Sequence, residues 1–554
     1  MRVPPAAFWT VVALAAAGLA ALLLASGAGE TPVGRAAVYT GCAESPDDVN
    51  PLTAQSPVAR RLVLAYTHDA LIAVDPATGE LRPAAAERFE PAADGGSCTF
   101  TLRAGLRFAD GSEATIDDAL FPWELAQAGH LAFGFVGDAM AQVRAVTRLD
   151  ERSFRVDFRD RHFAGVRVVG ENWLLVSRGF FVRRLAARVA PAVLPPVDSA
   201  AFAALLAQAT SECGPGTGPY RLDNPPDGPG DWRPRQDLLL RPNAHSWRRA
   251  ADPAAWTFAG VRVLFRDQQA ATNELFAGAL DWFSSPALDD LLRARPALAA
   301  DYRRLVYDYD ALGVYRVVWN CRRGATADPR VRRALGRLFD VDALRAGNEG
   351  LGAAAVAHAK PGSPAVPKDL APLGFAPAAA RDELRALGFD AAAGKPLRLV
   401  VLAPQGTEVL QRIGDLFADA CRRAGVDLEL RRRDFAAYVQ ERQRGEWDGL
   451  LALQSFRPWG DPWDLLHGDG VDNAGGWRHP DADRLADAAR GEPEPARREA
   501  LWRELHALAH REQPASLLVH PLASILLHRR VEGATVGQNG LVLERARIAG
   551  PADR

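Results

Sequence analysis

The sequence contains little cysteine, and its cysteines are not arranged for metal binding. Only five occur among 554 residues, namely Cys42, Cys98, Cys213, Cys321 and Cys421. None belongs to a CxxC pair, so nothing suggests a zinc site or an iron–sulfur cluster. An oxidising compartment permits one or two disulfides, whose pairing the sequence does not give. Because the number of cysteines is odd, at least one thiol would remain unpaired.

Long runs of one charge are also missing. Charged residues make up 24% of the chain, and the formal net charge is −2. Binding to nucleic acid phosphates needs clustered Lys and Arg. We therefore expect no nucleic acid among the partners of this protein.

The motifs of common enzyme classes are absent as well. The sequence has no nucleophile elbow, no Walker loop and no dinucleotide fingerprint. Two pairs of carboxylates fit helix starts, where negative charge meets the positive end of the dipole, namely Asp117 with Asp118 and Asp481 with Asp483. His506 and His510 are four residues apart but lack the HExxH order that supplies a catalytic Glu. We expect no catalytic residue, no metal and no cofactor.

One long apolar run is present, near the amino terminus. Residues 8–26 carry no charge and follow Arg2. The run is longer than a usual signal core and about long enough to cross a bilayer, which takes ~20 residues. It is either a signal peptide cleaved near Ala28 or an uncleaved membrane anchor. Both alternatives predict that the remainder is exported.

The periodicity of the chain indicates an α/β protein with two or three domains. In the last third, the pattern predicts strands at 397–403, 426–432 and 448–453, with helices at 408–424 and 434–444 between them. Further helices are expected at 59–71, 180–210 and 328–344, and strand-like segments at 36–42, 150–168 and 516–527.

Residues 99–119 contain an especially clear local pattern. Apolar residues alternate through Phe100 and Leu102, and a turn follows at Asp110-Gly111. Thr115, with Asp118 three residues later, is typical of a capped helix start. We expect a strand or hairpin, a turn and a helix that fix the local scaffold.

Several short motifs follow one another along the chain in a fixed order. They are residues 50–52 (NPL), 71–90 (LIAVDPATGELRPAAAERFE), 99–119, 216–222 (GTGPYRL), 238–247 (LLLRPNAHSW), 277–282 (AGALDW), 319–320 (WN) with 328–335 (DPRVRRAL), 424–430 (AGVDLEL), 460–462 (GDP) and 479–485 (HPDADRL). In this order and spacing they resemble the family 5 extracellular solute-binding proteins of ABC importers, which include oligopeptide-, dipeptide- and nickel-binding proteins. The resemblance covers about residues 36–535.

The resemblance implies a two-lobed periplasmic-binding-protein fold, type II and cluster C-like, with a hinge and one lobe split into two subdomains. After the amino-terminal segment 1–28, the first lobe would comprise subdomain I, from residues 29–72, 206–310 and 516–554, and subdomain II, from residues 73–205. The second lobe would comprise residues 311–515. Ligand would be held in the cleft and released when the hinge opens.

The resemblance also implies where a ligand would bind. Members that bind peptides use an Asp, three residues before the DP pair, to hold the free amino group of the ligand. In residues 453–465 (LQSFRPWGDPWDL) that position is Pro458, which cannot pair with an ammonium, and Arg457 beside it would repel one. This departure predicts a ligand with an anionic or sugar-like polar group that Arg457 would bind.

Other ligand contacts are expected nearby and across the cleft. Trp459 and Trp463 are candidates to stack on a flat or apolar face of the ligand. The alternative is that both pack within the protein while Arg457 faces solvent. The remaining candidates are Ser455, the strand-to-helix turn with Gln405 and Thr407, and Glu44 in the loop after the first strand. Asn50 and Asn320 are expected to be structural.

These observations favour the substrate-binding component of an ABC importer. It would capture an oligopeptide-like or other small polar solute by lobe closure and deliver it to membrane permease subunits. We expect a monomer located in the periplasm or outside the cytoplasm, and anchored to the membrane if residues 8–26 are retained. The alternatives are a membrane-tethered sensor or scaffold on the same fold, and an exported hydrolase.

Overall fold

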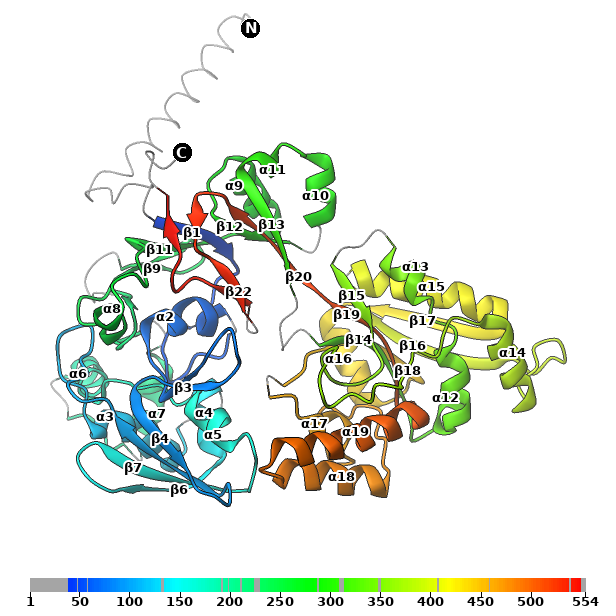
Figure 1. Cartoon of the computed structure of the whole chain (residues 1–554), viewed down its shortest axis with the longest axis horizontal. Helices are drawn as coiled ribbons and strands as arrows, with labels where there is room; N and C mark the ends of the chain where they lie inside the picture. Colours follow the sequence, from blue (N-terminus) through cyan, green and yellow to red (C-terminus); the bar gives the residue numbers. More distant parts are fainter. Residues whose placement is uncertain are drawn as a thin grey trace, which may run out of the picture.

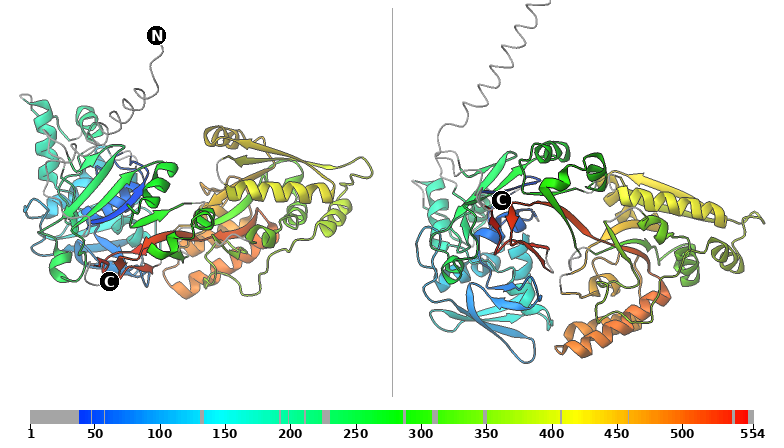
Figure 2. Two further views of the ribbon diagram at one scale, coloured as in Figure 1. Left: turned by 90° about the horizontal axis from the view of Figure 1, so that it is seen from above. Right: turned by 45° about the horizontal axis from the view of Figure 1, so that its top comes forward.

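The computed structural model describes residues 38–549, apart from residues 47, 57, 131–133, 191–192, 198, 210–211, 224–229, 286–287, 308–312, 347–349, 406–407, 458 and 538–539. The chain forms two α/β lobes that are joined along one edge (Figures 1 and 2). The apolar segment 8–26 lies outside the described residues. Within the described part, no helix combines the length and the apolarity needed to cross a membrane.

An eight-stranded sheet forms one part of the first lobe. Its strands run in the order β13-β20-β12-β1-β11-β10-β8, and β9 pairs with β10. Their bounds are β1 Val38–Ala43, β8 Tyr220–Arg221, β9 Trp232–Arg233, β10 Asp237–Pro242, β11 Gly260–Phe265, β12 Trp282–Ser284, β13 Tyr302–Tyr307 and β20 Ala523–His528. The helices of this part are α8 Trp247–Ala251, α9 Gln268–Phe276, α10 Leu288–Ala294 and α11 Leu298–Asp301. The sheet therefore combines strands from the beginning, the middle and the end of the described chain.

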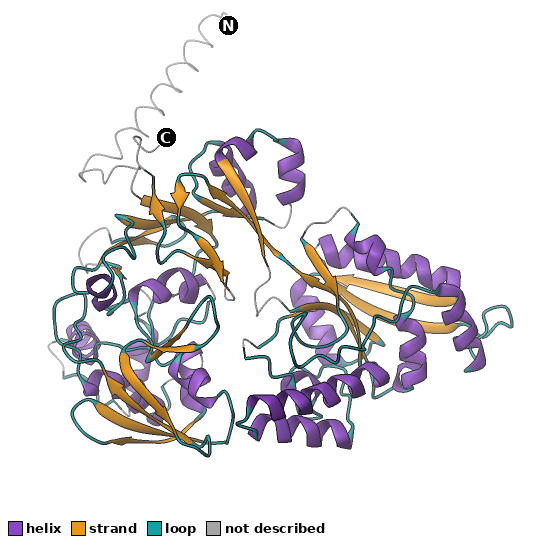
Figure 3. Ribbon diagram, in the orientation of Figure 1, coloured by secondary structure: helices purple, strands orange, loops and turns teal. Residues whose placement is uncertain are grey.

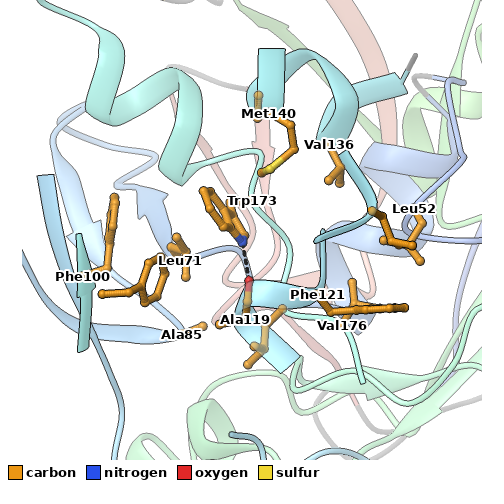
Figure 4. Close-up of a cluster of buried hydrophobic side chains, with 14 of the residues drawn as sticks. Leu52, Leu71, Ala85, Phe100, Ala119, Phe121, Val136, Met140, Trp173 and Val176 are labelled. Atoms are coloured by element: carbon orange, nitrogen blue, oxygen red, sulfur yellow. Dashed lines mark hydrogen bonds between the residues drawn. The ribbon is translucent and has the colours of Figure 1, made fainter. Parts of the chain in front are cut away.

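A four-stranded sheet in the order β4-β5-β7-β6 forms the other part of the first lobe. Its elements are β4 Ala86–Pro91, β5 Ser97–Leu102, β6 Val143–Arg148, β7 Ser153–Phe158, α3 Ile116–Gln127, α4 Gly134–Ala141, α5 Gly165–Gly170, α6 Arg178–Val189 and α7 Ala200–Ala207. Its core is centred on Trp173, which is fully buried and donates a hydrogen bond from Nε1 to the Ala119 carbonyl at 2.7 Å (Figure 4). This bond satisfies the polar atom of the ring inside an apolar cluster.

Residues 99–119 adopt the expected strand, turn and helix. Thr115 is the N-cap of α3, and Asp118 accepts hydrogen bonds at 2.8 Å from both the backbone N–H and the hydroxyl of Thr115. The carboxylate lies at the positive end of the helix. The prediction that Asp118 serves a helix start is confirmed.

Short elements link and border these sheets. They are η2 Ala59–Leu64, α2 Ala65–Thr67, β2 Ile72–Val74, β3 Leu81–Pro83, β21 Val531–Glu532, β22 Thr535–Gly537, β23 Gly540–Val542 and β24 Arg547–Ile548. The helix expected at 59–71 is shorter, because it ends before the extended residue His68.

The second lobe contains a six-stranded sheet in the order β15-β19-β14-β18-β16-β17 (Figure 3). Its strands are β14 Val314–Trp319, β15 Leu351–Ala354, β16 Leu397–Pro404, β17 Val426–Arg433, β18 Gly449–Gln454 and β19 Ala515–Pro521. The other elements are η3 Ala325–Ala327, α12 Pro329–Gly336, α13 Val341–Arg345, α14 Pro377–Ala386, α15 Glu408–Ala424, α16 Phe435–Arg444, α17 Trp463–Leu466, α18 Pro480–Gly491 and α19 Pro495–Glu512.

Both faces of this sheet are covered, as strand alternation requires. Val317 belongs to the cluster that includes buried residues of α12, α14 and α15, whereas the next residue, Val318, packs with Tyr438 of α16. The continuous apolar character of these strands follows from burial on both sides.

The chain passes between the lobes twice. β13 pairs with β20 in the first lobe, and the next strand, β14, pairs with β18 and β19 in the second. The chain returns at Leu522, between β19 and β20. The strand expected at 516–527 is therefore two strands in different sheets. The chain leaves the six-stranded sheet after Pro521, later than the boundary expected at 515/516, and the other expected boundaries stay predictions.

Two expected helices are also interrupted. The segment 180–210 forms α6 and α7, separated by a proline-containing stretch that cannot continue a helix. The segment 328–344 forms α12 and α13, because Asp340 caps a new helix by accepting the Ala343 N–H at 2.9 Å.

The segment 150–168 was expected to be strand-like but ends as a helix. Only β7 is extended, and α5 follows it. Gly165 and Gly170 allow α5 to approach its neighbours, because a Cβ at Gly170 would come within 2.8 Å of the Ile72 side chain. Tertiary packing therefore decides the conformation of this apolar stretch.

All five cysteines are unpaired, so the structure contains none of the disulfides that an exported location permits. Burial raises the pKa of Cys98 and Cys213 to about 12 and that of Cys42 and Cys321 to about 11. Since the thiolate is the reactive form, we expect very slow reaction with a disulfide reagent at pH 8 in the folded protein. Five thiols should react rapidly in denaturant, and a lower count would contradict the unpaired state.

Candidate functional site

The segment that follows β18 forms a small pocket on the second lobe. Its walls include Ser455, Arg457, Asp461, Asp464 and Asp472, and its volume is ≈ 10 Å³, which is room for about one water molecule. Gly460 has a φ of 78°, a conformation that glycine adopts without strain, and it allows the chain to turn towards α17.

Arg457 is already paired with carboxylates in this pocket. Its Nε and Nη2 donate to Asp464 Oδ2 at 2.9 and 2.7 Å, and Asp472 lies 4.0 Å away. The Arg457 side chain is nevertheless 45% exposed. A ligand anion would therefore have to compete with Asp464 for the guanidinium, which weakens the expected grip on an anion.

Asp461 is the buried carboxylate of the pocket. It binds Arg490 of α18 at 2.9 and 2.8 Å and accepts the Trp463 N–H at 3.1 Å. Its third partner is His162 of the first lobe, whose Nε2 lies 3.4 Å from Oδ2. Burial would raise the pKa of Asp461, but the hydrogen bond with His162 and the charge of Arg490 outweigh it and hold the pKa below its usual value.

The neighbour of His162 extends this contact between the lobes. The Phe163 N–H donates to the Arg490 carbonyl at 3.1 Å, and its ring meets Trp502 edge-on at 5.4 Å between centroids. The guanidinium carbon of Arg498 lies 4.0 Å from the Phe163 ring centre. The lobes are therefore in contact through His162 and Phe163, and not only through the two chain crossings. Figure 1 shows α18 and α19 facing the first lobe on the side away from β20.

The two tryptophans of the predicted site lie in different surroundings. The Trp463 ring stacks on His467 at 4.2 Å and lies 4.1 Å from the Arg490 guanidinium carbon, while its Nε1 donates to Asp487 at 2.8 Å. Trp463 thus packs within the second lobe. Trp459 is half-buried, and its Nε1 is shielded from solvent without a hydrogen-bond partner in the described part of the chain.

The other candidates do not line this pocket, except Ser455, which is exposed at its edge. Gln405 is exposed at the end of β16, where its N–H donates to the Arg433 carbonyl at 2.7 Å, and Thr407 lies outside the described residues. Glu44 is exposed after β1 in the first lobe. The structure brings Ser455 and Arg457 together and leaves Gln405 and Glu44 on other elements.

Sequence reasoning missed four residues around this pocket. Asp464 and Asp472 neutralise Arg457, His358 lines the pocket wall, and His162 reaches it from the first lobe. The acidic side chains beside an expected Arg site were a visible signal of charge compensation. No local signal marks His162, since it lies 299 residues from Asp461 in the sequence (461 minus 162).

Several residues singled out in the sequence have structural roles. Asn50 is fully buried and donates from Nδ2 to the Ala209 carbonyl at 2.9 Å. Asn320 donates to the Trp447 carbonyl at 2.9 Å. His506 and His510 contact two different backbone carbonyls, those of Ala365 and Ala371. In the described ranges, no group of three or more His, Cys, Asp or Glu residues is placed to hold a metal ion.

Comparison with known proteins agrees with this geometry. The family model described as bacterial extracellular solute-binding proteins, family 5 Middle, matches residues 80–475. Protein XP55 of Streptomyces lividans is 26% identical over 550 residues, covering 93% of this chain and 88% of that protein. The periplasmic murein peptide-binding protein MppA of Escherichia coli is 28% identical over 236 residues, covering 39% of this chain and 40% of that protein.

A solved structure extends the comparison to the fold. The oligopeptide-binding protein AppA of Bacillus subtilis, in complex with a nonapeptide, superposes with a TM-score of 0.68. The identity is 17%, and the match covers 93% of this chain and 99% of that one. At this identity the likeness concerns the fold alone, and it confirms the expected two-lobed architecture.

Proposed function

Because the chain belongs to family 5 of the bacterial extracellular solute-binding proteins, we propose that it is the substrate-binding component of an ABC importer. It captures an oligopeptide-like or other small polar solute between its lobes and delivers it to a membrane permease. It acts as an exported monomer and does not transform its ligand. The names of the relatives, which bind a murein peptide and an oligopeptide, support the peptide-like class.

The observation that carries this proposal is that the two lobes are connected in two places around the pocket of residues 455–472. The two chain crossings join the lobes on one side, and Asp461 in the pocket wall meets His162 of the other lobe. A solute held between these contacts would favour the closed form through its own interactions with both lobes. Closure by rotation about the crossings is the motion that such two-lobed proteins use.

The test is to identify what the protein carries and whether it leaves unchanged. Mass spectrometry of material released from the purified protein should find a small solute, which rebinds in calorimetry and is recovered intact. Recovery of a cleaved product would instead support the exported hydrolase. Amino-terminal sequencing of the exported protein separates a free binding protein from the membrane-tethered sensor, because only the latter keeps residues 8–26.

The proposed ligand contacts are Arg457, Trp459 and Ser455 from the second lobe, and Gln405, Thr407 and Glu44 remain further candidates from the sequence. Trp463 supports this wall through its packing on Arg490, which in turn binds Asp461. Arg457 contributes an exposed edge of its guanidinium, and Asp464 holds that group in place.

We expect peptides with a free amino terminus to bind no better than the same peptides after N-acetylation. By the resemblance to the family, Pro458 stands at the position of an Asp that binds the free amino group of a peptide ligand. Arg457 beside it repels an ammonium group. Calorimetry with matched peptide pairs measures the difference. A clear preference for the free amine would contradict this prediction and would point to Asp464 or Asp472 as the amine partner.

Ligand binding should change the tryptophan emission of the protein, and part of the change should disappear in Trp459→Ala. The half-buried Trp459 lies within the segment 455–472, and its shielded Nε1 has no partner among the described residues. Trp463→Phe is the matched control, since that ring is packed between neighbours and should contribute less to the change. Equal signals in wild type and Trp459→Ala would exclude Trp459 from the cleft.

A further inference from the structure

A second cavity, larger than the pocket of residues 455–472, lies inside the second lobe. It has a volume of ≈ 140 Å³ and is bounded by β19, α19, the ends of α12 and α13, and the segments 354–358 and 372–375. The lining residues Asp342, Pro372 and Gly374 are exposed and mark its mouth. His358 and His506, with 4% and 1% exposure, form part of its deep wall.

His506 lines this cavity and carries a hydrogen-bond acceptor without a partner among the described residues. Burial lowers the pKa of His506 to about 4, so the ring is neutral at pH 7. Its Nδ1 lies 2.9 Å from the Ala365 carbonyl. Because a carbonyl only accepts, Nδ1 must carry the hydrogen, and Nε2 is left with a lone pair. That Nε2 is buried and has no partner among the residues that the structure describes.

His358 presents a donor by the converse argument. Burial, together with the neighbouring charge of Arg316, holds the pKa of His358 well below its usual value, so this ring is also neutral. Its Nε2 lies 3.3 Å from Nη1 of Arg316, a group that only donates. Nε2 must therefore accept, and the hydrogen resides on Nδ1. This Nδ1 is buried, and the described part of the chain offers it no partner.

Other polar side chains of the wall have partners in the protein. The Ser516 hydroxyl accepts the Trp319 Nε1–H at 2.9 Å, and His510 Nε2 contacts the Ala371 carbonyl at 2.9 Å. Gln513 donates to the His510 carbonyl at 2.7 Å. Apolar side chains, among them Phe339 and Leu518, also line the cavity. The wall thus combines apolar side chains with an imidazole donor and an imidazole acceptor that lack partners among the described residues.

We propose that this cavity is a binding site for a small neutral molecule that carries both a hydrogen-bond acceptor and a donor, such as a phenol or a primary amide. Its size suits one six-membered ring, since an apolar cavity of about 150 Å³ binds benzene. A neutral ligand is favoured because neither free imidazole nitrogen offers a charge, and a buried ion would need a partner. A hydroxyl or amide group satisfies both nitrogens, whose unmet hydrogen bonds are costly.

The lining of this cavity differs from that of the pocket of residues 455–472 except at His358. His358 also borders the small pocket of residues 455–472, so it forms part of both walls. Binding at this site does not depend on the proposed transport function.

The experiment compares phenol with benzene by calorimetry on the full chain at pH 7. Each net hydrogen bond contributes about 0.5–1.5 kcal/mol, so phenol should bind roughly 5- to 100-fold more tightly than benzene. His506→Leu should remove most of that preference and leave benzene binding. The matched control is His510→Gln, which changes a lining imidazole whose Nε2 is already engaged, and it should keep the preference.

A second variant covers the case in which His506→Leu does not fold. Ala509→Leu adds volume at a lining position without changing either imidazole, and it should abolish binding of both phenol and benzene. The proposal is overturned if neither probe binds saturably, which would mean that the cavity holds only water. It is also overturned if phenol and benzene bind equally, or if His510→Gln acts like His506→Leu.

Discussion

Replacing Asp281 with alanine should lower the stability of the first lobe by about 3–5 kcal/mol, the usual cost of removing one partner of a buried ion pair. Asp281 is fully buried, and its carboxylate accepts the Thr40 N–H at 2.9 Å and binds Nη2 of Arg530 at 2.7 Å. Its backbone bonds Thr40 and His528 at 2.7 and 2.8 Å. One side chain therefore ties β1 to the start of β12 and to the residues after β20.

Urea unfolding measures this effect, provided that each transition is fitted by itself, because a two-lobed chain need not unfold in one step. Asp281→Asn should be nearly as damaging, since it keeps the shape but removes the charge that Arg530 binds. Asp75→Ala is the control in the same lobe. Asp75 is partly exposed in a hairpin turn, where it accepts the N–H groups of Ala77 and Thr78, and its loss should cost about 1 kcal/mol. Similar small losses for Asp281 and Asp75 would refute the role of the buried pair.

Elements with strong local signals were predicted well from the sequence. The helix expected at 408–424 is α15, Glu408–Ala424, because its amphipathic pattern is long and regular. The strand expected at 397–403 is β16, which ends one residue later. The division between β19 and β20 escaped prediction, because residues 515–527 form one apolar stretch whose two halves pair in different sheets. Only the partners of each half, distant in sequence, decide where it breaks.

The position of the candidate site stays a prediction, and its electrostatics could not be predicted from the sequence. The motif order points to the segment with Ser455, Arg457 and Trp459, since the resemblance to the family implies ligand contacts there. The pairing of Arg457 with Asp464 depends on the turn at Gly460 and the start of α17, which the motif does not describe. The contact of His162 with Asp461 depends on how the lobes meet, and no pattern within either lobe encodes it.

Phe163→Ala should shift the unliganded protein from a closed towards an open arrangement of the lobes. The ring contributes an aromatic pair with Trp502, about 0.5–1.5 kcal/mol, and a cation–π contact with Arg498, about 0.5–2 kcal/mol. The closed-to-open ratio should therefore fall by roughly 5- to 400-fold. Small-angle scattering should detect a larger radius of gyration, and the ligand should bind more weakly although Phe163 lies outside the pocket.

Phe276→Ala separates a loss of lobe contact from a general loss of packing. Phe276 is also half-buried beneath an arginine, with the Arg295 guanidinium carbon 4.1 Å from its ring centre, but both residues belong to the first lobe. Its substitution should lower stability without changing the radius of gyration or the affinity. If Phe163→Ala leaves the radius of gyration and the affinity unchanged, the His162–Phe163 contact does not hold the lobes together. Closure would then have to come from the ligand alone, because a ligand shifts such an equilibrium only by its differential affinity for the two states.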